Sequence, residues 1–171
     1  MQREEIRHPI PPVYDAQSEL LILGSFPSVK SRETAFFYGH PQNRFWRVLA
    51  AVYGEPVPPD TEAEKKALLH RCHVALWDVI ASCSIEGSSD SSIRDVAAND
   101  LRPILQRARL RRIYVNGGTA EKLYQKYIEP ELGIRAVRLP STSPANAAWS
   151  LEKLCAAWKR IREEGDPPCI L

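Results

Sequence analysis

Four short apolar segments, separated by stretches with helical periodicity, are the feature that most constrains the fold of this chain. The segments are 20–23, 74–80, 113–115 and 136–139, and each has the length of a buried strand. In the stretches between them apolar residues recur every three or four positions, most clearly at Ala120, Leu123, Tyr124, Tyr127 and Ile128. Strands that alternate with helices pair in parallel and are covered on both faces, because each crossover helix packs back onto the sheet. The sequence therefore predicts an α/β fold, a three-layer αβα sandwich around a central, mostly parallel four-stranded sheet.

The length and composition of the chain indicate one domain. Its 171 residues are 44% apolar and 26% charged, which is typical of a single globular unit. Prolines cluster at 9–12, 56–59 and 167–168, and none of these clusters separates two cores. We therefore expect a single monomeric domain over 1–171, with an N-terminal segment 1–17 and a C-terminal tail 165–171 at its periphery.

No membrane segment and no metal site are expected. The longest aliphatic run, 20–23, is far shorter than the roughly 20 residues that cross a bilayer. The first twenty positions carry charges where a signal peptide needs an apolar core, so we expect a cytoplasmic protein. Cys72, Cys83, Cys155 and Cys169 include no C-x-x-C pair, which favours small buried or free thiols over a zinc or iron–sulfur site.

Small and polar residues stand at the ends of all four predicted strands. The first strand is followed by GSFPS at 24–28, the third by NGGT at 116–119 and the fourth by PSTSPAN at 140–146. Asp78 and Ser82 stand at the end of the second. The carboxyl ends of parallel strands meet at one edge of a sheet, which is where ligands bind in such folds. These converging turns favour a pocket whose floor is formed by backbone amides.

The segment FFYGHPQNRFW at 36–46 combines five aromatic residues with His, Gln, Asn and Arg. Aromatic faces and carboxamides are suited to a flat heterocycle, since stacking contributes about 1 to 3 kcal/mol per base. Phe45 and Trp46 fit the core face of the following helix, which leaves Tyr38 and Asn43 as candidate ligand-binding residues. Asn43 is also suited to cap that helix, and this alternative stays open.

Two of these motifs resemble those of a known family. GSFPS at 24–28, followed by HPQNRFW at 40–46, resembles the first motif of the uracil-DNA glycosylase superfamily, and LPSTSPAN at 139–146 resembles the second. The resemblance extends from about residue 18 to 162 and is strongest to the hypoxanthine-DNA (DNA-deoxyinosine) glycosylases, which are related to the mismatch-specific G:T/U enzymes. Phe26 replaces the catalytic Asp or Asn of the better-known branches, and Leu139 replaces the His that begins the second motif of the uracil enzymes.

The resemblance implies a monofunctional DNA glycosylase that hydrolyses the N-glycosidic bond of deaminated bases in base excision repair, without metal or cofactor. Hypoxanthine would be the first substrate, with uracil and xanthine as further candidates. Asn43 would orient the catalytic water in place of the missing residue of the first motif. The residues expected to bind the base are Gly24, Ser25, Phe26, Pro27, Tyr38 and Asp78. The residues expected to contact DNA are Ser28, His40, Ser141, Thr142, Ser143 and Asn146.

Asp78 and His40 each allow a second interpretation. The superfamily reads the C(=O)–N–H edge of the base with an Asn near the end of its second strand. Asp78 stands at about that place, where it would accept a hydrogen bond from the ring N–H. A salt bridge or a capping role for Asp78 stays open, as do purely local hydrogen bonds for His40. Tyr38 matches the position at which the mismatch enzymes stack an aromatic ring on the flipped base.

The expected partner is double-stranded DNA that carries a deaminated base, and binding to single strands stays open. Two other functions fit the same pocket. One is an N-glycosyl hydrolase or transferase that acts on free nucleosides or nucleotides. The other is a catalytically inactive nucleic-acid binding module, which the residues at 26 and 139 would explain.

Overall fold

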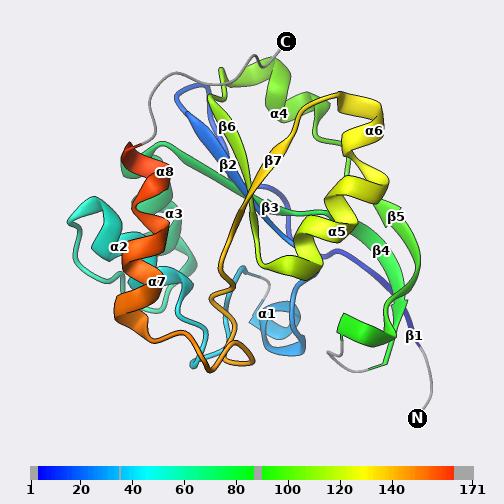
Figure 1. The fold of residues 1–171 in the computed structure, drawn as a ribbon, viewed down its shortest axis with the longest axis horizontal. Helices are drawn as coiled ribbons and strands as arrows, with labels where there is room; N and C mark the ends of the chain where they lie inside the picture. Colours follow the sequence, from blue (N-terminus) through cyan, green and yellow to red (C-terminus); the bar gives the residue numbers. More distant parts are fainter. Residues whose placement is uncertain (1–3, 35, 87–89, 164–171) are drawn as a thin grey trace.

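The four predicted strands form one parallel sheet (Figure 1). The computed structural model describes residues 4–34, 36–86 and 90–163. In their spatial order the strands of this sheet are β3 (Val74–Asp78), β2 (Leu20–Gly24), β6 (Arg112–Asn116) and β7 (Ala136–Leu139). All neighbouring pairs are parallel, with Leu20 opposite both Val74 and Arg112. The predicted four-stranded parallel sheet is confirmed.

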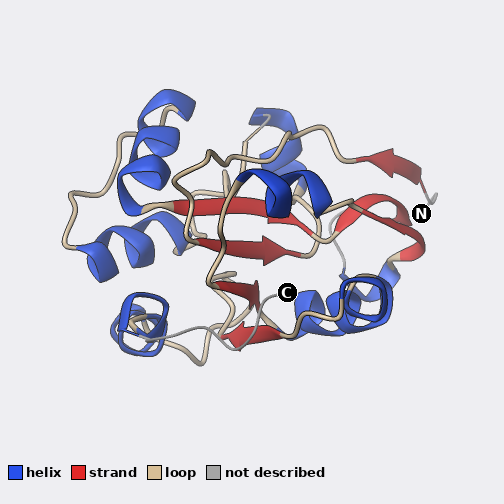
Figure 2. Cartoon of the chain, turned by 90° about the horizontal axis from the view of Figure 1, so that it is seen from above, coloured by secondary structure: helices blue, strands red, loops and turns tan. Residues whose placement is uncertain are grey.

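Helices cover both faces of this sheet and complete the three layers (Figures 1 and 2). One side carries α2 (Phe45–Tyr53), α3 (Glu62–Cys72), α7 (Leu151–Trp158) and α8 (Arg160–Glu163). The other side carries α4 (Arg102–Arg107), α5 (Gly118–Tyr127) and α6 (Glu129–Leu132). Successive residues of β2 pack on opposite faces of the sheet. Ile22 belongs to the hydrophobic core on the side of α2 and α3, whereas Leu21 and Leu23 belong to the core on the side of α4 and α5. A strand buried on both faces is apolar throughout, as its sequence predicts.

A second, antiparallel sheet lies beside the first and was not predicted. Its strands, in the order β1-β4-β5, are β1 (Glu4–Arg7), β4 (Ile80–Ile85) and β5 (Arg94–Ala98). The apolar segment 74–80, expected to be one strand, is divided: β3 ends at Asp78 and the chain enters β4 at Ile80. The side-chain amide of Asn99 fixes this corner by donating to the carbonyls of both residues, at 2.9 and 3.1 Å.

Part of the N-terminal segment, expected at the periphery, belongs to the core. Ile10 and Val13 are 2% and 5% exposed. Val13 also forms an antiparallel bridge with Leu76 at the edge of the parallel sheet. Prolines at 9, 11 and 12 separate these apolar residues, so the segment lacks the continuous apolar run that marks the central strands.

Two short elements complete the described chain. Helix α1 (Val29–Thr34) follows the first motif and lies at the carboxyl end of the parallel sheet (Figure 1). A 3₁₀ turn, η1 (Asp90–Ser92), precedes β5. Among the described residues, every helix is too short or too polar to cross a bilayer.

Candidate active site

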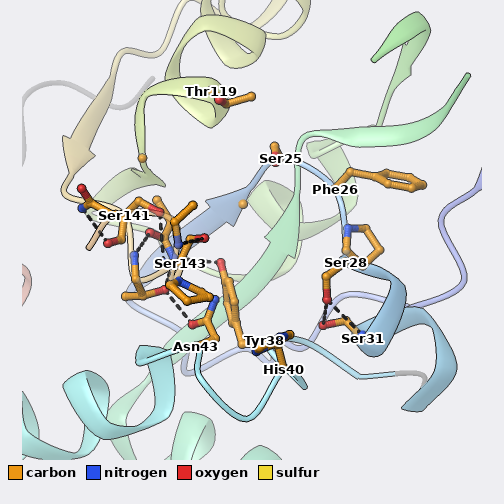
Figure 3. A pocket seen from close by; sticks show the side chains of 18 of the residues that line it. Ser25, Phe26, Ser28, Ser31, Tyr38, His40, Asn43, Thr119, Ser141 and Ser143 are labelled. Carbon is orange, nitrogen blue, oxygen red and sulfur yellow. Dashed lines mark hydrogen bonds between the residues drawn. The ribbon is translucent and has the colours of Figure 1, made fainter. Parts of the chain in front are cut away.

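One cavity of about 1190 Å³ lies at the carboxyl ends of the parallel strands. Figure 3 shows side chains from both sequence motifs around it. All residues predicted for the site line this cavity: Gly24, Ser25, Phe26, Pro27, Ser28, Tyr38, His40, Asn43, Asp78, Ser141, Thr142, Ser143 and Asn146. The two motifs are therefore brought together, although about 100 residues separate them in the sequence.

Gly24 and Asp78 form the end of the β2–β3 pair, where they stand opposite each other. A Cβ atom on Gly24 would press against the Asp78 carboxylate and lie 3.0 Å from the Tyr38 hydroxyl oxygen. Real Cβ atoms do not approach a carboxylate this closely, so the position requires glycine. The absence of a side chain at residue 24 lets the Asp78 carboxylate and the Tyr38 hydroxyl both approach Gly24 at the wall of the cavity.

Tyr38 presents an aromatic ring that is held by a stacking partner on one face and by a hydrogen bond to its hydroxyl. Its ring stacks on Phe45 with a centroid separation of 4.3 Å and an interplanar angle of 18°. Its hydroxyl accepts a hydrogen bond of 3.2 Å from the Asn116 side-chain amide. Burial, reinforced by the nearby Asp78 carboxylate, raises the pKa of Tyr38 well above its ordinary value, so the phenol is neutral. The backbone of Tyr38 has a φ of 52°, the left-handed conformation that is uncommon outside glycine and that concentrates at functional sites.

A chain of hydrogen bonds connects Asn43 to Tyr38 through two other side chains. The Thr142 hydroxyl donates to Asn43 Oδ1 at 2.9 Å and accepts from Asn116 Nδ2 at 3.0 Å. The Thr142 backbone N–H donates to Asn116 Oδ1 at 3.1 Å. Asn116, which ends β6, also donates to Tyr38, so its amide connects both motifs with the end of a strand. The sequence placed Asn116 at a strand end but gave no reason to single it out from its neighbours.

The carboxamide of Asn43 has one defined orientation. The Phe45 backbone N–H donates to its Oδ1 at 2.9 Å, in addition to the bond from Thr142. A backbone N–H can only donate, so the atom that receives it is oxygen and the other terminal atom is Nδ2. Within the described chain no group accepts from Nδ2. Asn43 thus accepts from the first backbone N–H of α2, in line with the capping alternative, and still has an N–H₂ group without a partner among the described residues.

Arg44 holds the second motif against the first. Its backbone N–H donates to the Thr142 carbonyl at 3.1 Å. Its guanidinium donates to the carbonyls of Ser143 at 3.0 Å and Asn146 at 3.1 Å, and also to that of Trp149. The planar fork of an arginine suits such convergent acceptors. Arg44 stands within the first motif, but its role could not be predicted because the backbone carbonyls that it contacts are common to every residue.

The loop at 140–146 is also braced internally. Ser143 N–H donates to Ser141 Oγ at 3.1 Å, Ala145 N–H donates to Ser143 Oγ at 3.1 Å, and the Asn146 amide donates to the Ser141 carbonyl at 3.0 Å. Ser141 and Ser143 are partly exposed at the rim. Thr142 was expected to contact DNA. Its side chain is instead completely buried, and its hydroxyl forms hydrogen bonds with Asn43 and Asn116.

Phe26 points away from Asn43 (Figure 3). Its ring meets the edge of His8 at a centroid distance of 5.8 Å, and the Arg32 guanidinium lies 5.6 Å from its centroid. His8 in turn contacts Asp78, with 2.7 Å between Nε2 and Oδ2. The salt-bridge alternative for Asp78 is therefore met by a hydrogen bond from His8 to one of its two oxygens. His8 was missed because it lies in the segment expected at the periphery.

His40 and Ser28 lie on the rim among local partners. His40 Nδ1 accepts from the Gln42 backbone N–H at 3.0 Å, as its local alternative proposed. Ser28 Oγ accepts from the Ser31 N–H at 3.1 Å within the first turn of α1. In the described ranges there is no cluster of three or more His, Cys, Asp or Glu side chains arranged to hold a metal ion.

A parallel sheet with a cavity at the carboxyl ends of its strands defines an α/β ligand-binding protein. Comparison with known proteins makes the assignment narrower: the chain belongs to the Uracil DNA glycosylase superfamily, whose family model matches residues 11–164.

Relatives and a solved structure agree with this assignment. A protein of Methanosarcina acetivorans called hypoxanthine DNA glycosylase is 36% identical over 146 residues, which cover 85% of this chain and 91% of the relative. A Methanosarcina barkeri protein with the same name is 32% identical over 148 residues, which cover 86% and 92%. The fold also matches a solution NMR structure from Methanosarcina acetivorans, provisionally called a uracil DNA glycosylase. The TM-score is 0.74 at 32% identity, with 92% of this chain and 99% of that chain covered.

Proposed function

We propose that this protein is a monofunctional DNA glycosylase that removes hypoxanthine from deoxyinosine in DNA, as a single domain acting as a monomer. The name shared by the two Methanosarcina relatives supports the substrate. The observation that carries the proposal is the free amide group of Asn43, held by the second motif at the wall of a cavity large enough for a purine.

The flipped base would stack on Tyr38. Phe45 covers one face of that ring, and Tyr38 itself lines the cavity, so the other face is the one available to a base. Gly24, Ser25, Phe26 and Pro27 would surround the base from the end of β2. An inosine in a mismatch is weakly paired, which lowers the free energy needed to turn it out of the duplex.

Hydrolysis breaks the bond between N9 of the base and C1′ of the sugar. The electron pair of that bond moves to N9, a water oxygen bonds to C1′, and the proton that the water loses is balanced by one that the departing base takes up, which yields free hypoxanthine and an abasic site. An oxocarbenium-like sugar reacts with neutral water, so the protein must place the water rather than deprotonate it. Asn43 Nδ2 would donate to the water oxygen and fix it on one side of C1′.

The rim of the cavity would bind the DNA backbone. Ser28, His40, Ser141 and Ser143 are partly exposed there and carry groups that donate hydrogen bonds to phosphates. Asn146 would stabilise the loop at 140–146 through its bond to the Ser141 carbonyl, and its partly exposed side chain would face the DNA.

The direct test uses end-labelled duplexes with a single deoxyinosine, uracil or xanthine, resolved on denaturing gels before and after hot alkali. We expect deoxyinosine strands to be cleaved only after alkali, because a monofunctional enzyme leaves an abasic site intact. Strands that stay whole for all three lesions at high enzyme and low salt would refute the proposal.

Free deoxyinosine in the same assay addresses the nucleoside-hydrolase alternative. Release of hypoxanthine from the free nucleoside at a rate independent of salt would favour that alternative. A DNA glycosylase instead loses affinity steeply as salt rises, since binding releases counterions from the phosphates.

A further inference from the structure

His8 and Asp78 form a buried pair that joins the two sheets beneath the cavity. His8 Nε2 lies 2.7 Å from Asp78 Oδ2, and their side chains are 3% and 5% exposed. His8 directly follows β1 of the antiparallel sheet, whereas Asp78 ends β3 of the parallel sheet. Of the two, Asp78 lines the cavity and His8 is not among its described lining residues.

The hydrogen bonds of His8 define its tautomer. The Ile10 backbone N–H donates to Nδ1 at 3.1 Å, so Nδ1 carries no proton. The ring proton therefore resides on Nε2, which donates it to Asp78 Oδ2. The rings of Phe26, Phe37 and Trp77 surround the imidazole, with centroids 5.8, 6.1 and 6.3 Å away. Both the orientation of the imidazole and the direction of its bond to Asp78 are fixed.

The second oxygen of Asp78 is the one available to a ligand. Oδ1 lies beside the position that a Cβ atom on Gly24 would occupy, and the Tyr38 hydroxyl lies near the same position. No donor among the described residues bonds to Oδ1. An ionised carboxylate accepts hydrogen bonds and cannot donate them. The floor of the cavity therefore presents one fixed acceptor.

A fixed acceptor distinguishes deaminated bases from their parents. Deamination of adenine to hypoxanthine converts ring atom N1 from an acceptor into an N–H donor, and deamination of cytosine to uracil does the same at N3. A carboxylate attracts the N–H of either product and repels the lone pair of either parent base. We infer that His8 is a positioning residue for specificity: it holds Asp78 as an acceptor that recognises the ring N–H created by deamination. This inference rests on the proposed glycosylase function.

The test compares two purine substrates that differ at N1. Deoxyinosine carries N1–H, whereas deoxynebularine, with unsubstituted purine as its base, has a bare N1. Single-turnover excision is measured for each in the same duplex. His8→Phe keeps an aromatic ring in the surrounding cluster but removes the donor to Asp78. We expect excision of hypoxanthine to slow about 10- to 100-fold, the usual effect of losing a hydrogen bond to a charged group, and excision of purine to change less than about threefold.

Asp78→Asn tests the direction of the bond. The Nε2–H of His8 would hold the new carbonyl oxygen, which turns the amide N–H₂ toward the cavity. The cavity then presents a donor, so preference should shift at least about tenfold toward the bare N1 of purine. With His8→Phe added, the amide is free to turn, and the shift should be smaller.

Two further variants supply controls. His8→Gln places an amide donor near the position of Nε2 and should restore much of the wild-type preference. His70→Phe removes another His–Asp contact, in which His70 Nδ1 lies 3.0 Å from Asp15 Oδ2 on the exposed surface, and should leave the preference unchanged. Where excision of purine is too slow to time, the preference can be measured instead from how strongly free hypoxanthine and free purine inhibit the excision of hypoxanthine from DNA.

The outcomes separate this inference from the function on which it rests. A wild-type protein that releases no base refutes the glycosylase and this inference together. An active wild type whose His8→Phe variant slows equally on both substrates, or whose Asp78→Asn variant keeps the original preference, refutes the role of His8 alone. A defect of folding slows both substrates equally, so it cannot imitate the expected change in preference.

Discussion

The Thr142 hydroxyl donates a 2.9 Å hydrogen bond to Asn43 Oδ1 and so connects the two sequence motifs inside the candidate active site. Thr142 is completely buried, and its hydroxyl also accepts from Asn116. If the hydroxyl were removed, Asn43 Oδ1 and Asn116 Nδ2 would each lose a hydrogen-bond partner. The precision with which Asn43 faces the cavity therefore depends on a residue of the other motif.

Thr142→Val should lower the single-turnover excision rate about 10-fold or more and reduce the free energy of unfolding by about 1 to 3 kcal/mol, because it leaves buried polar groups unpaired. The measurements are excision kinetics and urea unfolding. Thr61→Val is the matched control, since Thr61 caps α3 through a 3.3 Å bond from Glu64 N–H. Its loss should reduce stability by about 1 kcal/mol and leave the rate unchanged. Equal rate effects in the two variants would show that stability alone is involved.

Asn43→Ala should slow excision about 100- to 1000-fold with little change in DNA affinity, because its amide is proposed to act on the water and not on the duplex. Rate and affinity are measured separately, by single-turnover kinetics and by fluorescence anisotropy. Gln42→Ala removes the adjacent, exposed carboxamide and should have no such effect. Full activity in Asn43→Ala would mean that another group places the water.

The central sheet and the location of the site could be predicted from the sequence because both leave continuous local signals. Strands buried on two faces are apolar throughout, as β2 is, and the turns that follow them are small and polar. Parallel strands bring those turns to one edge, so a list of strand ends already approximates the lining of the cavity.

The antiparallel sheet leaves no comparable signal. β5 is largely exposed, and a single residue, Val79, separates β3 from β4, so no turn residues mark the boundary between them. The contact between His8 and Asp78 spans 70 positions, and nothing near either residue indicates the other. The Arg44 contacts end on backbone carbonyls, which every residue possesses. Such features become visible only once the chain is folded.

Arg44→Lys should weaken binding to a deoxyinosine duplex about 10-fold, because a lysine lacks the planar fork that engages several loop carbonyls together. The comparison is best made by anisotropy in the Asn43→Ala background, where the substrate stays intact. Arg47→Lys, on the exposed side of α2, is the control and should bind as the parent does. Unchanged affinity in Arg44→Lys would show that the loop keeps its shape without the guanidinium.

Three tyrosines should make the fold less stable in alkaline solution. Burial raises the pKa values of Tyr38, Tyr53 and Tyr124 well above the ordinary value near 10. The unfolded chain therefore loses these protons at a lower pH than the folded chain does. Their contribution to stability is complete below pH 10 and is lost as the pH rises further, since ionisation then favours the unfolded state.

Urea unfolding at pH 8, 10 and 11 measures this loss, and Tyr124→Phe identifies one contributor. Tyr124 is fully buried and donates a 2.6 Å hydrogen bond to the Ile134 carbonyl, which a phenolate cannot do. The variant should be less stable than the wild type at pH 8 because it lacks that bond. Between pH 10 and 11, however, the free energy of unfolding of the variant should fall less steeply than that of the wild type. The two slopes should differ by up to about 1.4 kcal/mol per pH unit, because the variant has one ionisable phenol fewer. Parallel curves for the two proteins would mean that Tyr124 ionises alike in the folded and unfolded chains.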